Sequence, residues 1–182
     1  LSTIQVSPTI EFHIPDGTLS YEKLFVEHSN KFILVGLSPI NGACPGFTPP
    51  STSHIYRFNV DGHLDNSFEN VQSILSNLGD VVTVAGILQD DEDNLYISGH
   101  AASTNSQCSI TTNSYYFTIK VKPNGTRDLS FGNQGMLDEA AVQLLDNTLF
   151  ARSDNHIFAY SLSGRPKKEF GVNGVATLTK SN

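Results

Sequence analysis

One short pattern occurs three times in this chain, and it restricts the folds that the chain can adopt. In each copy an alternating stretch of apolar and polar residues ends in a turn glycine, and a phenylalanine follows six residues after that glycine. The pairs are Gly62 and Phe68, Gly125 and Phe131, and Gly164 and Phe170. An internal repeat of this kind indicates a row of similar supersecondary units that cover one another.

The stretch before each glycine has the period of a β-strand. In the second copy the apolar residues Ile119 and Val121 flank Lys120, and the first copy has Arg57 between two aromatic residues. Side chains that alternate with a period of two lie on opposite faces of a strand. The third copy has Ala159 at the cationic position, so we expect that strand to be more covered or merely to carry less charge.

Glycines after the phenylalanine distinguish the first copy from the other two. Phe131 and Phe170 are each followed by a glycine at once and by another three residues later. The first copy continues as Phe68-Glu69-Asn70-Val71 and has neither glycine. We expect the glycines to turn the chain tightly and the phenylalanines to fill the core. We also expect a strand around Val71 to Leu75 to complete the first unit.

The copies belong to units of four short strands joined in a meander, with a repeat length of roughly 54 to 63 residues. The unit boundaries are approximately 21–78, 79–139 and 140–182, and residues 1–20 add an N-terminal strand segment. This organisation predicts a single all-β domain over residues 1–182. The expected fold is a β-propeller-like array of about three four-stranded antiparallel blades, with an extra N-terminal strand and very little helix. A fragment of a longer array, a pair of half-propellers and an unusually small ring are all compatible with three units.

The motif KPNGTRDLSFGNQG at residues 122–135 resembles the delta-60 repeat of bacterial proteins that are mostly secreted or attached to the cell surface. Four further segments match other parts of that repeat: ILVG at 33–36, LYISG at 95–99, VDGHLDNSF at 60–68 and EFGVNG at 169–174. The first unit departs from the pattern at Glu69, and the resemblance covers about Leu24 to Lys180. It implies a β-propeller-like array and an extracytoplasmic location, and it implies no established chemistry.

Charge and hydropathy argue against two classes of partner. The formal net charge is −7, whereas nucleic-acid binding depends on clustered Lys and Arg. No run of eighteen apolar residues is present, so we expect no segment that spans a membrane. The chain opens at Leu1 rather than Met, so we expect its start to have been trimmed or processed, and the removal of a signal peptide stays open.

Two cysteines occupy matching places in successive units. Cys44 lies eight residues after Gly36, and Cys108 lies nine residues after Gly99. Equivalent loops of neighbouring units are close in space, so we expect a Cys44–Cys108 disulfide, which would indicate an oxidising compartment. The alternative is two unlinked thiols in exposed loops.

Two long connections are candidates for a binding surface. Residues 38–53 and 102–114 expand the same connection in the first two units, and the third unit lacks it. Both expansions therefore emerge on one rim of the array, where loops on a rigid β scaffold commonly carry function. Their composition suits a protein surface or a glycan, and the candidate binding residues on this rim are Phe47, His100, Asn105 and Thr111. The alternative is that the loops only cover an open end of the stack.

The sequence offers few residues for catalysis or metal binding. The only dense carboxylate cluster is DDEDN at 90–94, in which Asp91 and Asp93 are calcium candidates, with a merely solvated acidic turn as the alternative. No other cofactor is indicated. His100 could act as an acid or a base beside a carboxylate. No nucleophile-elbow or phosphate-binding motif is present, so we assign no catalytic residue.

These observations lead to three hypotheses of function. The leading one is a secreted or cell-surface binding or interaction module without catalysis, which presents the long loops to its partner. The second is an extracellular carbohydrate-active or other hydrolase that uses His100 or the cluster at 90–93. The third is an architectural segment of a larger surface protein, and a homodimer or a longer array is compatible with each hypothesis. A deep pocket with two carboxylates or a His–carboxylate pair would favour the hydrolase, whereas a flat rim would favour binding.

Overall fold

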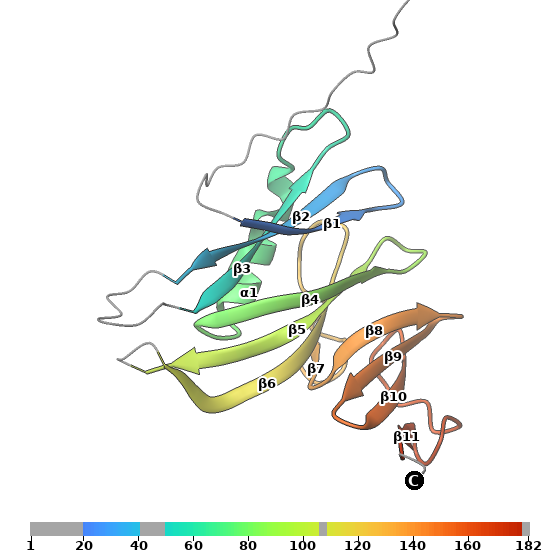
Figure 1. Cartoon of the computed structure of the whole chain (residues 1–182). Coiled ribbons are helices and arrows are strands. Elements are labelled where there is room, and N and C mark those ends of the chain that lie inside the picture. The colour runs from blue at the N-terminus through green and yellow to red at the C-terminus, as the bar shows by residue number, and fades with distance from the viewer. Residues whose placement is uncertain (1–19, 41–49, 106–108, 180–182) are drawn as a thin grey trace, which may run out of the picture.

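The computed structural model describes residues 20–40, 50–105 and 109–179, which form three antiparallel sheets in chain order (Figure 1). The first sheet contains β1 (Ser20–Val26), β2 (Phe32–Pro39) and β3 (Ser51–Phe58). The second contains β4 (Val81–Gln89), β5 (Leu95–Thr104), β6 (Ile110–Val121) and β7 (Met136–Leu137). The third contains β8 (Ala140–Leu145), β9 (Thr148–Ser153), β10 (His156–Ser161) and β11 (Val175–Thr177). The 3-10 helix η1 (Asn66–Phe68) and helix α1 (Glu69–Ser76) connect the first two sheets, so the expected all-β fold with very little helix is confirmed.

The three repeat segments, which belong to units one, two and three, adopt the same backbone. In unit two the N–H of Gly125 donates to the carbonyl of Lys122, and the N–H of Phe131 donates to the carbonyl of Asp128. Units one and three form both hydrogen bonds at the matching residues. The turn glycines all have a positive φ: 85° at Gly62, 80° at Gly125 and 76° at Gly164. Repeated sequence therefore corresponds to repeated geometry, because only glycine adopts this φ without strain.

The strand expected around Val71 to Leu75 is wrong, because these residues lie in α1. In units two and three the glycine after the phenylalanine, Gly132 or Gly171, has a φ of 56° or 54° and turns the chain toward a fourth strand. Unit one has Glu69 at that place. Because L-residues disfavour positive φ, the chain continues there as a right-handed helix with Val71 and Leu75 buried on one face. A four-stranded blade is therefore wrong for unit one, whereas units two and three have four strands each.

A side chain of α1 takes the place of the missing strand at the edge of β3. The Gln72 Oε1 atom accepts a hydrogen bond of 3.0 Å from the N–H of Ile55, and the Gln72 Nε2 atom donates one of 3.5 Å to the carbonyl of Ser53. An amide side chain offers the same donor and acceptor types as a peptide group. Gln72 thus satisfies two backbone groups that an edge strand would otherwise leave open to pairing.

Two hydrophobic cores lie between the three sheets. β3 packs against β4, and β8 packs against β4, β5 and β6. Within β5 the side chains of Leu95 and Ile97 enter the core between the first and second sheets, whereas Tyr96 enters the core between the second and third. This alternation follows from the period of a strand. The second sheet is consequently buried on both faces.

Successive units meet at the repeat turn. A Cβ atom at Gly125 would lie 2.5 Å from the carbonyl oxygen of Ser67, and one at Gly164 would lie 2.5 Å from the N atom of Gly132. Ser67 and Gly132 are the chain neighbours of the repeat phenylalanines in units one and two. Each turn glycine therefore permits a close approach of two backbones as well as a positive φ.

A buried cation fixes the same turn of the following unit. Arg57 Nη2 donates a hydrogen bond of 2.9 Å to the carbonyl of Pro123, and Lys120 Nζ donates one of 3.4 Å to the carbonyl of Leu162. Pro123 and Leu162 occupy the same position in the turns of units two and three. The cationic positions of the repeat thus lie in the contacts between units, and in unit three this position is held by the buried Ala159.

Within the described residues the three sheets do not close into a ring. The N-terminal strand segment expected at residues 1–20 lies outside the described residues, except for Ser20, which begins β1. In the part of the chain that the structure describes, no helix is long and apolar enough to cross a membrane.

Candidate functional site

The structure describes part of the expected binding rim. The described ranges leave out Cys44, Phe47 and Cys108. The predicted Cys44–Cys108 disulfide therefore lies outside the described residues. The Asn105 Oδ1 atom accepts a hydrogen bond of 3.0 Å from the N–H of Ser109, and this contact joins the end of β5 to the start of β6. Thr111 lies in β6. Figure 1 shows the adjoining ends of β2 and β3 and those of β5 and β6 on the same side of the molecule, as the repeat predicts.

The acidic turn at residues 90–94 is held together by its own hydrogen bonds. The Asp90 carboxylate is buried and accepts hydrogen bonds from the N–H of Asn94 and from the Tyr96 hydroxyl. Asp93 accepts a hydrogen bond from a glutamine side chain in β4. No group of three or more His, Cys, Asp or Glu residues among the described residues is placed to hold a metal ion. The geometry around Asp91 and Asp93 therefore offers the calcium hypothesis no support.

His100 lies in a groove between the second and third sheets. The groove has a volume of about 280 Å³, with walls from β4, β5 and β6 on one side and from β8 and β9 on the other. Its lining residues are Thr83, Ala85, Gly99, His100, Tyr116, Ala140, Val142, Arg152, Ser153 and Asp154. The groove thus exists only because two units stack.

An aromatic pair forms one wall of the groove. His100 in β5 and Tyr116 in β6 are directly opposite each other in the register of the two strands. Their ring centroids are 5.6 Å apart and the ring planes meet at 69°, which is an edge-to-face arrangement. Tyr116 keeps 42% of its surface exposed, so its ring is available to a ligand.

The third sheet contributes two charged residues, Arg152 and Asp154, which sequence reasoning missed. Gly99 of unit two and Ser153 of unit three hold equivalent positions in the repeat. The residues that follow them, His100 and Asp154, are therefore equivalent as well. A comparison of units two and three could therefore have indicated Asp154. Nothing in the spacing indicated Arg152, whose side chain enters the groove only through the packing of the two sheets.

Among the described residues, the groove contains no formed His–carboxylate pair. His100 and Asp154 line the same groove, but within the described residues no hydrogen bond or ion pair joins His100 to a carboxylate. A general acid or base acts on a proton of the bound substrate, within hydrogen-bond reach or through one water, and a carboxylate partner serves to orient a histidine in that role. The groove combines an exposed aromatic ring and a cation, both on strands, with the carboxylate of Asp154, which lies in the turn after β9.

A carboxyl with a raised pKa lies next to the groove but points into the protein. Burial raises the pKa of the Glu139 carboxyl, and the hydrogen bond of 2.9 Å from the Tyr160 hydroxyl opposes this effect without cancelling it. The carbonyl of Glu139 also accepts a hydrogen bond from the Thr118 hydroxyl. These contacts give Glu139 a structural role between the second and third sheets.

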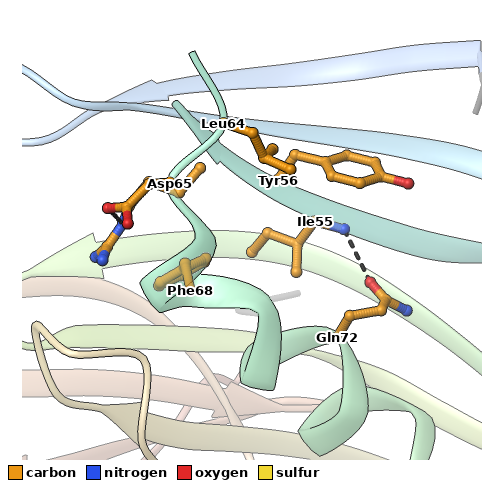
Figure 2. Close-up of a pocket in the computed structure, with 7 residues that line it drawn as sticks. Ile55, Tyr56, Leu64, Asp65, Phe68 and Gln72 are labelled. Atoms are coloured by element: carbon orange, nitrogen blue, oxygen red, sulfur yellow. Dashed lines mark hydrogen bonds and ion pairs between the residues drawn. The ribbon is translucent and has the colours of Figure 1, made fainter. Parts of the chain in front are cut away.

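A smaller cavity of about 200 Å³ lies in unit one beside the missing fourth strand (Figure 2). Figure 2 shows Gln72 reaching from α1 toward Ile55, with Phe68 lying between the helix and β3. Polar groups in the lining are engaged within the protein, since Arg57 Nε donates a hydrogen bond of 2.9 Å to Asp65. The cavity is a consequence of the helix replacing a strand, and we assign it no ligand.

Asp65 in this cavity has a strongly perturbed pKa. Burial alone would raise the pKa of its carboxyl. Hydrogen bonds from Lys31 Nζ, at 2.6 Å, and from Ser67, together with the charge of Arg57, outweigh burial and hold the pKa well below its ordinary value. Asp65 is therefore ionised at neutral pH and stabilises unit one.

The residues that define the candidate site are His100, Tyr116, Arg152 and Asp154, at the contact between two repeat units. The chain matches no protein-family model, and comparisons with curated proteins and with solved structures give no match.

Proposed function

We propose that this protein is a secreted or cell-surface binding module without catalysis, and that the groove between the second and third sheets takes up a carbohydrate. In this proposal the sheets are blades of a β-propeller-like array built from delta-60-like repeats. The observation that carries the proposal is the exposed Tyr116 ring beside Arg152 and Asp154 in a groove formed by two units.

Carbohydrate is favoured over a flat protein surface because of the chemistry of this groove. A sugar ring has apolar C–H faces that pack on an aromatic ring, and hydroxyl groups that both donate and accept hydrogen bonds. The Tyr116 ring supplies the first contact, while Arg152 can donate and Asp154 can accept hydrogen bonds. A volume of about 280 Å³ suits a group the size of a ring rather than a protein epitope.

The position of the groove also supports this function. Tyr116 and Arg152 lie on strands, which hold recognition groups more firmly than loops do, whereas Asp154 lies in the turn after β9. His100 in β5 and Tyr116 in β6 are directly opposite each other, so the pairing of these two strands fixes their relative positions.

A glycan-binding screen followed by calorimetric titration tests this proposal. Tyr116→Ala is expected to weaken binding of the best glycan at least about tenfold, which corresponds to about 1.4 kcal/mol. Tyr115→Ala is the matched control, because Tyr115 is 36% exposed in the same strand and does not line the groove. Absence of glycan binding by the parent chain, or equal loss in both variants, would contradict the proposal.

A hydrolase is the second candidate, because His100 and Asp154 line one groove. It predicts turnover of a glycoside or ester substrate that His100→Ala abolishes while Tyr115→Ala leaves it intact. Binding without turnover in the same assays would favour the non-catalytic module. An architectural role in a larger surface protein predicts neither binding nor turnover.

A further inference from the structure

The turns that join the first two strands of each unit meet around a second cavity, away from the groove. Its volume is about 590 Å³, within the range of small-molecule sites. The lining comes from all three units: Phe25, Val26, His28, Ile87, Leu88, Gln89, Asp91, Gln143, Leu144, Leu145, Asp146 and Asn147.

Gln89 fixes one wall of this cavity. Its Oε1 atom accepts a hydrogen bond of 2.9 Å from the N–H of His28 in unit one, and its Nε2 atom donates one of 2.9 Å to Asp93 in unit two. The turns of units one and two share a positive φ of 61° at Asn30 and Asp93. The wall is thus a built contact between two turns of like geometry.

Two carboxylates in the lining are not used by the protein. The side chains of Asp91 and Asp146 have no hydrogen-bond or ion-pair partner within the described residues. The neighbouring Asp90, by contrast, is buried and accepts several hydrogen bonds. The lining holds two exposed carboxylates and no Lys or Arg, and its one imidazole, His28, lies 3.7 Å from Asp93. This composition favours a cation over an anion.

The inner part of the cavity is apolar. Phe25 and Ile87 pack against the core between the first and second sheets, and Leu88 and Leu144 pack against the core between the second and third. The cavity therefore lies over both cores and combines an apolar floor with acidic groups. A hydrated metal ion would gain nothing from that floor, whereas an aliphatic chain would.

We propose that this cavity binds a primary alkylammonium group, with its aliphatic stem on the apolar floor and its charge near Asp91 and Asp146. The ligand class includes free diamines and the side chain of lysine. This site is separate from the carbohydrate groove and does not depend on it.

Titration of the full chain with cadaverine, followed by amide NMR shifts and calorimetry, tests the site. The expected result is a localised shift of the amides at 87–91 and 144–147, with no shift by pentanediol, the uncharged analogue. Calcium is expected not to compete. Titration with the N-acetyl amide of lysine distinguishes the two sources, since equal or tighter binding than cadaverine indicates a lysine side chain and weaker binding indicates a free diamine.

Charge variants decide whether the binding is local. Asp91→Asn and Asp146→Asn are each expected to weaken cadaverine binding at least about fivefold. Asp138→Asn is the matched control, because Asp138 is exposed and lies outside the lining. Equal weakening in all three variants would show only the effect of net charge and would overturn the proposal, as would binding of pentanediol with equal affinity or no shift at 87–91.

Discussion

Gly125 of unit two lies directly against Phe68 of unit one, since a Cβ atom at Gly125 would come within 3.1 Å of the Phe68 Cα atom. A Cβ atom at Gly164 of unit three would likewise come within 3.1 Å of the Cε2 atom in the Phe131 ring of unit two. The turn glycine, which all three copies of the repeat share, therefore lies at the contact between units. A positive φ and a close backbone neighbour both disfavour a Cβ atom at this residue.

Gly125→Ala is expected to lower the free energy of unfolding by about 2 kcal/mol or more. The positive φ alone costs about 1–2 kcal/mol for an L-residue, and the contact with the Ser67 carbonyl adds to it. Urea unfolding measures the loss. Gly86→Ala is the control, because its Cβ would meet Ser98 Oγ at an ordinary 3.4 Å. Equal losses in the two variants would show that the contact between units is unimportant.

Gln72→Ala is expected to cost about 1–2 kcal/mol, because it leaves the N–H of Ile55 and the carbonyl of Ser53 without their partner. The freed edge of β3 should also favour association of the variant, which sedimentation velocity can detect. Asn70→Ala, an exposed change in the same helix, is expected to be near neutral. A stable, unassociated Gln72→Ala variant would contradict the role of the amide.

Asp65 should make the protein sensitive to acid. Its folded pKa lies below the ordinary 3.8, so its ionised form stabilises the fold above that pH. This contribution is lost as the pH falls through the depressed pKa. Unfolding free energies measured from pH 7 to pH 2 should therefore drop more steeply for the parent than for Asp65→Asn, which should already be less stable at pH 7. Parallel curves would rule out this linkage.

The contribution of Glu139 to stability should depend on pH in the opposite direction to that of Asp65. Its folded pKa is raised above the ordinary 4.5, so its contribution is present below that pH and is lost as the pH rises through the folded value. Glu139→Gln keeps an oxygen acceptor for the Tyr160 hydroxyl without the charge. The variant is expected to equal or exceed the parent in stability at pH 7, and this difference should shrink at pH 4. A variant less stable than the parent at pH 7 would contradict the raised pKa.

The predicted Cys44–Cys108 disulfide can be tested directly. Peptide mapping without reductant should recover one linked pair of peptides, and reduction should lower the melting temperature, because the bridge constrains the unfolded chain. Both thiols reacting fully with an alkylating reagent in the native, unreduced protein would show that they are unlinked.

The sequence could predict those parts of the fold in which a position requires one residue type for one physical reason. Gly62, Gly125 and Gly164 marked turns that all have positive φ, and alternation marked the strands before them. The loss of glycine after Phe68 was visible, but its outcome was not. Val71 and Leu75 suit a strand or a helix face, and the choice depended on packing against β3 and β4.

The candidate site was less predictable, because it forms between units. His100 was singled out by its place after a strand glycine, and its structural neighbours Tyr116 and Asp154 follow from strand register and from the repeat. Arg152 depends on how the third sheet packs against the second. The cavity at the turns likewise combines Asp91 and Asp146, which lie in equivalent turns of units two and three but meet in one lining only through the packing of the units.

β5 separates the two cores, with Leu95 facing one and Tyr96 facing the other. Removal of the first or the third sheet would therefore expose one face of β5, while the other face of β5 belongs to the core that remains. Boundaries drawn between repeats in the sequence do not mark points at which the protein can be divided into independent pieces. Cleavage before β8 would expose the Tyr96 face of the second sheet and leave the third sheet without the core that it shares with the second.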